Sequence, residues 1–114
     1  MAHQKFQDCI DECIACAIAC SHCATECLKE TNVKDLTHCI RLDMECAVIC
    51  RSAVELMSLG SKYSYDYCRV CIEICNVCAE ECEKHGAMGM DHCKACAEAC
   101  LKCATACEEM VAVA

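Results

Sequence analysis

The sequence predicts an all-α protein, an antiparallel up-down-up-down four-helix bundle with a cysteine-lined core. Nineteen of its 114 residues are cysteine, and almost all recur at alternating steps of three and four, the period of one helix face. The chain has no proline and only three glycines, so long helices can form without interruption. It has one phenylalanine and no tryptophan, so large aromatic side chains cannot fill the core. The thiols therefore take the inward positions at which a bundle normally places leucine.

Four helical segments are expected, over residues 3–29, 34–59, 62–84 and 90–111. The breaks between them fall at residues 30–32, 60–61 and 85–89, and the last of these contains two glycines. Asp91 is a candidate N-cap for the fourth helix. Connections this short make consecutive helices antiparallel. A chain of this length can bury one core, so we expect a single domain over residues 1–114.

Three of the four helices carry an unbroken stripe of cysteines. The first helix contains Cys9, Cys13, Cys16, Cys20, Cys23 and Cys27. The third contains Cys68, Cys71, Cys75, Cys78 and Cys82, and the fourth contains Cys93, Cys96, Cys100, Cys103 and Cys107. The second helix differs, because it has only Cys39, Cys46 and Cys50, with Asp43 at the inward position between the first two. An unpaired buried carboxylate is costly, so Asp43 is hard to explain as core filling.

The cysteine spacing suits metal binding better than disulfides or plain packing. Neighbours on one stripe have Cβ atoms roughly 5–6 Å apart, whereas a disulfide needs about 3.5–4.5 Å. Disulfides between helices are compatible with the spacing, although an odd number of cysteines leaves one thiol over. As core filling, leucine or isoleucine would bury more apolar surface at each position.

Cu(I) fits the stripes better than zinc or an iron–sulfur cluster, although thiolate ligands accept all three. Zinc sites usually close with four ligands, and iron–sulfur clusters need four cysteines around a discrete cage; no group of four is set apart here. Four thiolates around Zn(II) also leave negative charge in a dry core, which is costly. A Cu(I) ion that replaces one thiol proton leaves the core neutral, so roughly one ion per cysteine can be held.

Charge and the first residues of the chain indicate its compartment and exclude some partners. The formal net charge of −8 disfavours nucleic acid as a partner. No run of about 20 apolar residues is present, so no membrane span is expected. Residues 1–8 lack the basic start and the apolar stretch of a secretory signal, which indicates a cytoplasmic protein. Thiols stay reduced there, which again favours metal over disulfides.

The two ends of the predicted bundle differ in chemistry. One end collects Cys27, Leu36, His38, Cys39, Cys82, His85, Met88, Met90, His92 and Cys93. The other collects an apolar and aromatic plug of Phe6, Met57, Leu59, Tyr63, Tyr65, Tyr67 and Met110. Imidazole and thioether are weaker copper ligands than thiolate, so the His/Met end is the expected entrance. His85 continues the third stripe inward, whereas His38 and His92 fit a ligand role and a solvated position equally well.

The chain resembles the bacterial cytosolic copper storage proteins over essentially its whole length. The resemblance is carried by the cysteine stripes, by the segment HCIRLDMECAVIC at residues 38–50, and by His85 and His92. It implies a tetramer of four-helix bundles, each with roughly one Cu(I) per cysteine and an entrance at the histidine-bearing end. It also implies a metal contact for Asp43. The connection at residues 86–90 departs from the resemblance, because methionines stand where a histidine-rich loop is expected.

We therefore expect cytosolic storage or sequestration of many Cu(I) ions and no catalysis, because no catalytic motif appears. The predicted metal ligands are all nineteen cysteines together with Asp43, His85 and His92. A Zn/Cd sink of the metallothionein type and a thiol redox protein are the alternatives. Apolar residues beside the cysteines, such as Ile10, Ile14 and Ile40, favour a homo-oligomer. A copper chaperone or an efflux protein is a candidate partner.

Overall fold

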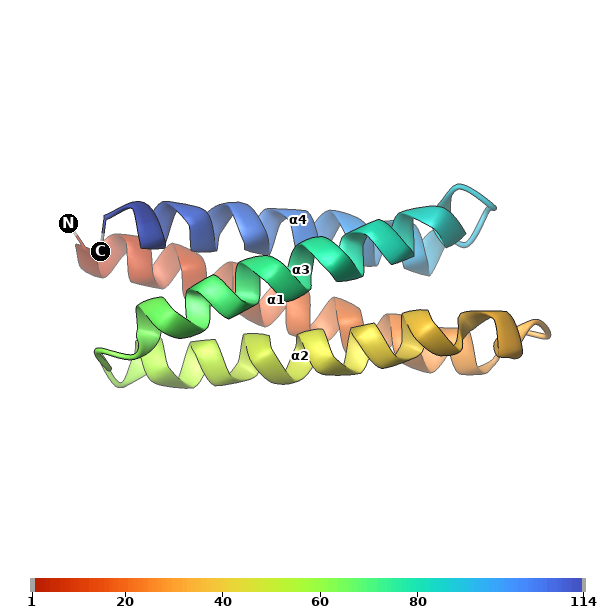
Figure 1. The fold of residues 1–114 in the computed structure, drawn as a ribbon, viewed down its shortest axis with the longest axis horizontal. Coiled ribbons are helices and arrows are strands. Elements are labelled where there is room, and N and C mark those ends of the chain that lie inside the picture. Colours follow the sequence, from red (N-terminus) through yellow and green to blue (C-terminus); the bar gives the residue numbers. More distant parts are fainter. Residues whose placement is uncertain (1, 114) are drawn as a thin grey trace.

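Four α-helices form an antiparallel bundle: α1 (Ala2–Leu28), α2 (Thr37–Ser58), α3 (Ser64–Gly86) and α4 (Asp91–Ala112), with a 3-10 turn η1 (Val33–Leu36) before α2. The computed structural model describes residues 2–113, with side chains from residue 6 onward. The helices run along the long axis of a body that measures 47 × 20 × 17 Å (Figure 1). Both chain ends lie beside the α2–α3 connection, and the other two connections lie at the opposite end. The predicted all-α, up-down-up-down fold class is confirmed.

Each helix packs against two neighbours, because α1 and α3 both lie against α2 and α4. Small side chains permit a close approach of the helices. Besides the cysteines, the buried residues include Ala17, Ala47, Ala79, Ala97 and Ala104. The interior is consequently narrow, and sulfur supplies most of its lining. No helix in the described part of the chain is long and apolar enough to cross a bilayer.

The ends of α2 and α3 are set by the same kind of glycine turn. Gly60 has φ +66° and Gly89 has φ +95°, a left-handed backbone that glycine adopts without steric cost. The N–H of Ser61, which follows Gly60, donates a hydrogen bond to the Leu56 carbonyl of α2 at 3.0 Å. The N–H of Met90, which follows Gly89, donates in the same way to the His85 carbonyl of α3 at 3.2 Å. This is the Schellman arrangement, which satisfies carbonyls that a helix end leaves free.

The second and third helices differ from prediction at their ends. Residues 33–36 form a 3-10 turn instead of the first turn of an α-helix, and the buried Leu36 packs that turn onto the bundle. The third helix begins at Ser64 instead of residue 62, because the Ser64 hydroxyl bonds to the Ser61 carbonyl at 2.7 Å and closes a turn. It also continues to Gly86, so His85, predicted in the connection, is helical.

Asp91 is not the N-cap of α4, and that prediction is wrong. Met90 occupies the cap position with an extended backbone and no side-chain cap bond, so Asp91 is the first helical residue. The glycine turn after α3 ends at Met90 and α4 begins at the next residue, so Met90 takes the cap position and Asp91 is already inside the helix. The Asp91 carboxylate still lies in the first turn, where it interacts favourably with the helix dipole.

Candidate metal centre

All nineteen cysteines lie in the described part of the chain, all are buried, and all are free thiols. Sulfur atoms on neighbouring helices reach contact distance. Cys13 Sγ on α1 lies 3.5 Å from Cys103 Sγ on α4, and Cys46 Sγ on α2 lies 3.6 Å from Cys75 Sγ on α3. A disulfide bond would need about 2.05 Å. The stripes therefore face one another across each helix interface as unbonded thiols.

Contacts between sulfurs also cross both diagonals of the bundle. Cys16 on α1 lies 3.9 Å from Cys75 on α3, and Cys50 on α2 lies 3.9 Å from Cys103 on α4. Along a single helix, Cys16 and Cys20 are 4.0 Å apart. Because sulfurs meet along helices, between neighbours and across diagonals, they fill the axis of the bundle. We call this continuous set of cysteine sulfurs the sulfur column.

The sulfur column contains groups of four thiols that share members. In three such groups all ligand atoms lie within 4.8 Å of one another: Cys16, Cys46, Cys50 and Cys75; Cys16, Cys20, Cys46 and Cys100; and Cys20, Cys78, Cys96 and Cys100. A divalent zinc site usually has four ligands of its own. Shared sulfurs instead suit a soft ion of low coordination number, many of which can line one column.

Asp43 is fully buried within the sulfur column. Its Oδ1 accepts hydrogen bonds from the thiols of Cys78 at 3.2 Å, Cys96 at 3.3 Å and Cys82 at 3.5 Å. Burial raises the pKa of the Asp43 carboxyl to about 10. The carboxyl is therefore neutral at pH 7 in the metal-free protein. A neutral acid bonded to thiols avoids the cost of an unpaired buried charge.

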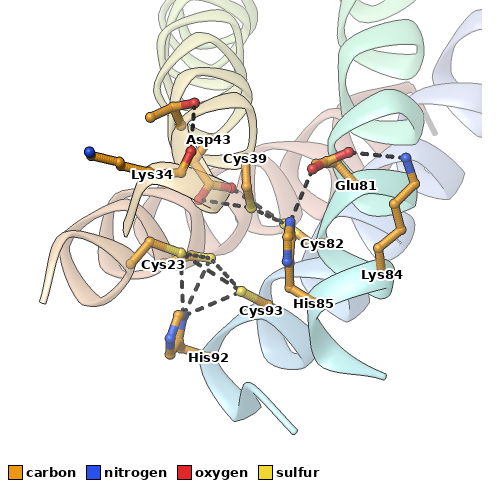
Figure 2. Close-up of polar contacts among 12 residues, drawn as sticks. Cys23, Lys34, Cys39, Asp43, Glu81, Cys82, Lys84, His85, His92 and Cys93 are labelled. Carbon is orange, nitrogen blue, oxygen red and sulfur yellow. Dashed lines mark hydrogen bonds and ion pairs between the residues drawn. The ribbon is translucent and has the colours of Figure 1, made fainter. Parts of the chain in front are cut away.

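Two histidines meet the sulfur column at the end that holds the α1–α2 and α3–α4 connections. His92 Nδ1 lies 3.5 Å from the sulfur of Cys93, 3.7 Å from that of Cys23 and 3.9 Å from that of Cys27. His85 is only 7% exposed. Figure 2 shows both imidazoles beside cysteines at this end of the bundle. The structure therefore places His92 in contact with three thiols, whereas His85 is buried at the end of the α3 stripe, three residues after Cys82.

The other residues expected at this entrance divide into two kinds. His38 is exposed on α2, and Met88 is 69% exposed on the α3–α4 connection. Met90 is partly buried and packs against the core. His85, His92 and Met90 thus lie next to the sulfur column, whereas His38 and Met88 face solvent.

The opposite end of the bundle is closed by apolar side chains, but not by all those predicted. Met57 and Met110 are buried, and the rings of Phe6 and Tyr65 pack with their centroids 5.9 Å apart. The remaining predicted members of the plug are exposed: Leu59, Tyr63 and Tyr67. The first two belong to the α2–α3 turn, and the third precedes an inward cysteine by one position and so points outward.

Glu81 belongs to the site although no motif in the sequence marks it as a site residue. Its carboxylate lies 3.1 Å from His85 Nε2 and 3.2 Å from Lys84 Nζ, and its side chain is 12% exposed. Burial raises the pKa of Glu81, but the hydrogen bonds from His85 and Lys84 outweigh burial and hold the pKa below its usual range. The only available signal was the i,i+4 spacing of Glu81 and His85, which is also typical of exposed helix surfaces.

Comparison with known proteins agrees with this geometry. A family model described as copper storage protein matches residues 2–112. The chain is similar to a cytosolic copper storage protein from Streptomyces lividans solved with five coppers, at 40% identity and a TM-score of 0.93 over 97% of this chain and 95% of that one. It is similar to metal-free copper storage protein 3 from Bacillus subtilis, at 47% identity and a TM-score of 0.85 over 92% of this chain and 97% of that one. A curated relative, the uncharacterized cysteine-rich protein YhjQ of B. subtilis strain 168, is 47% identical over 82 residues, 72% of this chain and 76% of the relative. The chain therefore belongs to the copper storage protein family.

Proposed function

We propose that the protein stores Cu(I) in the cytoplasm as a multinuclear thiolate core and that it catalyses no reaction. The observation that carries the proposal is the sulfur column, in which sulfurs meet along helices, between neighbours and across diagonals, and in which several groups of four thiols share members. Thiolate is a soft ligand that suits Cu(I), and shared sulfurs suit an ion of low coordination number. Membership of the copper storage protein family supports the same function, as does similarity to a Cu(I)-bound copper storage protein, at 46% identity and a TM-score of 0.88 over 94% of this chain and 98% of that one.

The proton balance of metal uptake favours a monovalent ion. Burial raises the pKa of the Cys27 thiol to about 11, so this thiol keeps its proton at pH 7. A bound metal must displace that proton, because the thiolate is the ligand. One Cu(I) per proton leaves the charge of the core unchanged, whereas Zn(II) bound by four thiolates does not.

The proposed ligands extend over the whole bundle, which we take as one copper-binding domain over residues 1–114. They are Cys9, Cys13, Cys16, Cys20, Cys23, Cys27, Cys39, Asp43, Cys46, Cys50, Cys68, Cys71, Cys75, Cys78, Cys82, His85, His92, Cys93, Cys96, Cys100, Cys103 and Cys107. Asp43 has a distinct place among them. Once Cys78, Cys82 and Cys96 give up their protons to bind copper, they no longer donate to Oδ1, and the carboxyl becomes available to a metal ion.

Copper enters this store at the histidine-bearing end. His92 lies among three sulfurs there, His85 lies at the end of the α3 stripe, and Met90 packs beside them. These ligands bind Cu(I) more weakly than thiolate, so they can pass an ion inward. The other end is closed by Met57 and Met110, which makes it a poor route.

A homo-oligomer, and a tetramer in particular, is the proposed assembly. The outer surface of α2 and α3 supports it, because Met44 and Val48 on α2 and Val70 and Val77 on α3 are exposed apolar residues that line one shallow groove. Exposed apolar patches of this kind mark interaction surfaces. A copper chaperone or an efflux protein would be the source or recipient of the copper; neither nucleic acid nor a membrane is a proposed partner.

The experiment that tests storage is an anaerobic titration of the reduced protein with Cu(I) against a competing chelator. Uptake that approaches one ion per cysteine, of which there are nineteen, is the expected result. Saturation with about four or five Zn(II) ions, at four thiolates each, together with weak Cu(I) uptake would favour the Zn/Cd sink. Reversible loss of free thiols in the absence of metal would favour a redox protein.

The entry route is tested separately, with variants that leave the sulfur column intact. The double variant His85→Ala/His92→Ala is expected to take up copper more slowly. Its final copper capacity should fall by no more than the ions that the two imidazoles themselves bind. His38→Ala is the matched control, because this histidine is exposed near the same end. Equal loading rates in all three proteins would place the entrance elsewhere.

A further inference from the structure

His85 carries a buried nitrogen that the fold leaves without a partner. Its Nδ1 is inaccessible to solvent and has no hydrogen-bond partner among the described residues, although the side chain as a whole is 8% exposed. Buried polar atoms are nearly always hydrogen-bonded, and leaving one unpaired costs about 1–3 kcal/mol. An orphan atom at the end of a stripe of metal-binding side chains therefore calls for a ligand.

The other nitrogen of the same ring is held by a carboxylate. His85 Nε2 lies 3.1 Å from Glu81 Oε2, and both side chains are largely buried, at 8% and 12% exposure. Lys84 Nζ, 3.2 Å away, binds the second oxygen of Glu81 and so helps to orient the carboxylate. Figure 2 shows Glu81 between Lys84 and His85, on the side of the imidazole away from His92 and Cys93.

Hydrogen-bond chemistry then dictates where the imidazole proton lies. An ionised carboxylate can only accept hydrogen bonds, so Nε2 must be the donor of this pair. A neutral imidazole has a single N–H. With the proton on Nε2, Nδ1 retains a free lone pair, which is what a soft metal ion needs from histidine.

We propose that Glu81 is a positioning residue that locks His85 in the Nε2–H tautomer, so that a bare Nδ1 receives the incoming Cu(I); this refines, and rests on, the proposed storage function. The arrangement is the carboxylate–histidine–metal relay, in which the outer carboxylate orients the ring and makes it more basic. Copper bound at Nδ1 displaces no proton, in contrast to copper bound at a thiol. Cys82 precedes His85 by three residues on the same face of α3, and its sulfur lies 3.6 Å from that of Cys39, so these two thiols would be the next ligands inward.

His92 provides an internal comparison, because it meets the sulfur column in a different way. Its Nδ1 faces the sulfurs of Cys23, Cys27 and Cys93, and its Nε2 has no hydrogen-bond partner in the described structure. Among residues 6–113, whose side chains the structure describes, no carboxylate forms a hydrogen bond with His92. The role assigned to Glu81 is therefore specific to His85.

The tautomer is measured directly in the reduced, metal-free protein. Long-range 1H–15N correlation spectra of the full chain, recorded about two pH units above the ordinary histidine pKa of about 6.5, distinguish a protonated from a bare ring nitrogen. His85→Ala and His92→Ala assign the two rings. We expect His85 in the wild type as a single Nε2–H form, a mixture of both forms in Glu81→Ala, and no change at His92. Glu80→Ala is the matched control, since Glu80 is an exposed acid adjacent to Glu81.

Loading kinetics then test whether Glu81 acts through His85. Glu81→Ala should slow the uptake of the first Cu(I) from a chelator by about tenfold, the lower end of the effect of losing an outer-shell partner. The same change made in a His85→Ala background should cause no further slowing, because contacting residues that act as a unit are not additive. Glu80→Ala should load at the wild-type rate, and final copper capacity should not depend on Glu81.

Two results would overturn the inference. One is a wild-type His85 that carries its proton on Nδ1, which requires no variant to be observed. The other is a Glu81→Ala effect on loading that is just as large when His85 is absent. Failure of the storage function gives a different signature, namely low Cu(I) capacity in a wild-type protein whose His85 is still a pure Nε2–H tautomer.

Discussion

Cys78 on α3 donates a hydrogen bond to Asp43 on α2, with 3.2 Å between Sγ and Oδ1, inside the sulfur column. The bond joins the one buried acid of α2 to the thiols of the facing helix. It accounts for a carboxyl where the other helices have cysteine, because thiol donors and a retained proton together remove the charge that burial would penalise. The stability of the metal-free protein consequently depends on the protonation of Asp43.

Asp43→Asn should stabilise the metal-free protein at neutral pH. Burial raises the pKa of Asp43 to about 10 in the folded state, against about 3.9 in the unfolded chain. Above pH of about 4 the unfolded state releases a proton that the folded state keeps, so the free energy of unfolding declines by up to about 1.4 kcal/mol per pH unit until the folded carboxyl also ionises. Asparagine has the same shape and no such loss.

Urea unfolding of reduced wild-type and Asp43→Asn proteins at pH 4, 5.5 and 7 measures this effect. The advantage of the variant should grow with pH and reach the order of a few kcal/mol at pH 7. Asp66→Asn is the control, because Asp66 forms only an exposed pair with Arg69 and should change stability by less than about 0.5 kcal/mol. A difference between the two proteins that does not vary with pH would contradict the neutral buried acid.

Cys50→Ala should lower copper capacity with only a modest loss of stability. The sulfur of Cys50 lies 3.6 Å from that of Cys71, 3.9 Å from those of Cys75 and Cys103, and 4.0 Å from that of Cys46. Its removal takes one ligand from several overlapping groups, so capacity should fall by at least one Cu(I). The small cavity should cost on the order of 1 kcal/mol. Chelator competition and urea unfolding supply the two readouts, and an unchanged capacity would mean that Cys50 binds no copper.

Gly86→Ala should destabilise the bundle, although glycine-to-alanine changes within helices normally stabilise by about 0.5–1 kcal/mol. A Cβ at this position would lie 3.1 Å from Lys94 Cα and 3.2 Å from Lys94 N on α4. Backbone atoms cannot rotate away, so α3 and α4 must separate beside the histidine-bearing end. We expect a cost of about 1–3 kcal/mol, typical of overpacking, in thermal or urea unfolding. A gain in stability would show that α3 and α4 can move apart at this point without losing packing energy.

Val48→Lys should weaken the proposed homo-oligomer. Val48 is 61% exposed and lines the largely apolar groove between α2 and α3, where an ammonium would have to lose its water on association, which is costly. Size-exclusion chromatography with light scattering should show a smaller mass for this variant than for wild type at equal concentration. Ser58→Lys, at an exposed position of the same helix, is the matched control. Equal masses for all three proteins would exclude this groove from the interface.

The inward direction of the cysteines could be predicted because it depends only on local helix geometry. Once residues 9–27 form one helix, steps of three and four place every cysteine from Cys9 to Cys27 on one side. The inward position of Asp43 on α2 was predicted by the same argument. The boundary positions were less predictable: Asp91 became the first helical residue instead of the cap because the glycine turn after α3 leaves no spare residue.

Glu81 shows where prediction from the sequence stopped. Its spacing to His85 is that of an ordinary surface pair, which would contribute little if exposed. Only the packing of the helices buries both side chains and leaves His85 Nδ1 without a partner. Exposure of Tyr63 and His38 likewise depended on where α3 begins and how α2 is rotated in the bundle.

The amino-acid sequence alone determined that the protein is a helical bundle with thiols inside, because helix period and residue type are local properties. The tertiary structure decided which sulfurs meet, that they touch across both diagonals, and that Asp43 and His85 lie within the same interior. Those relations join residues that are far apart in the chain, and they depend on the separation and rotation of four helices that no single segment encodes.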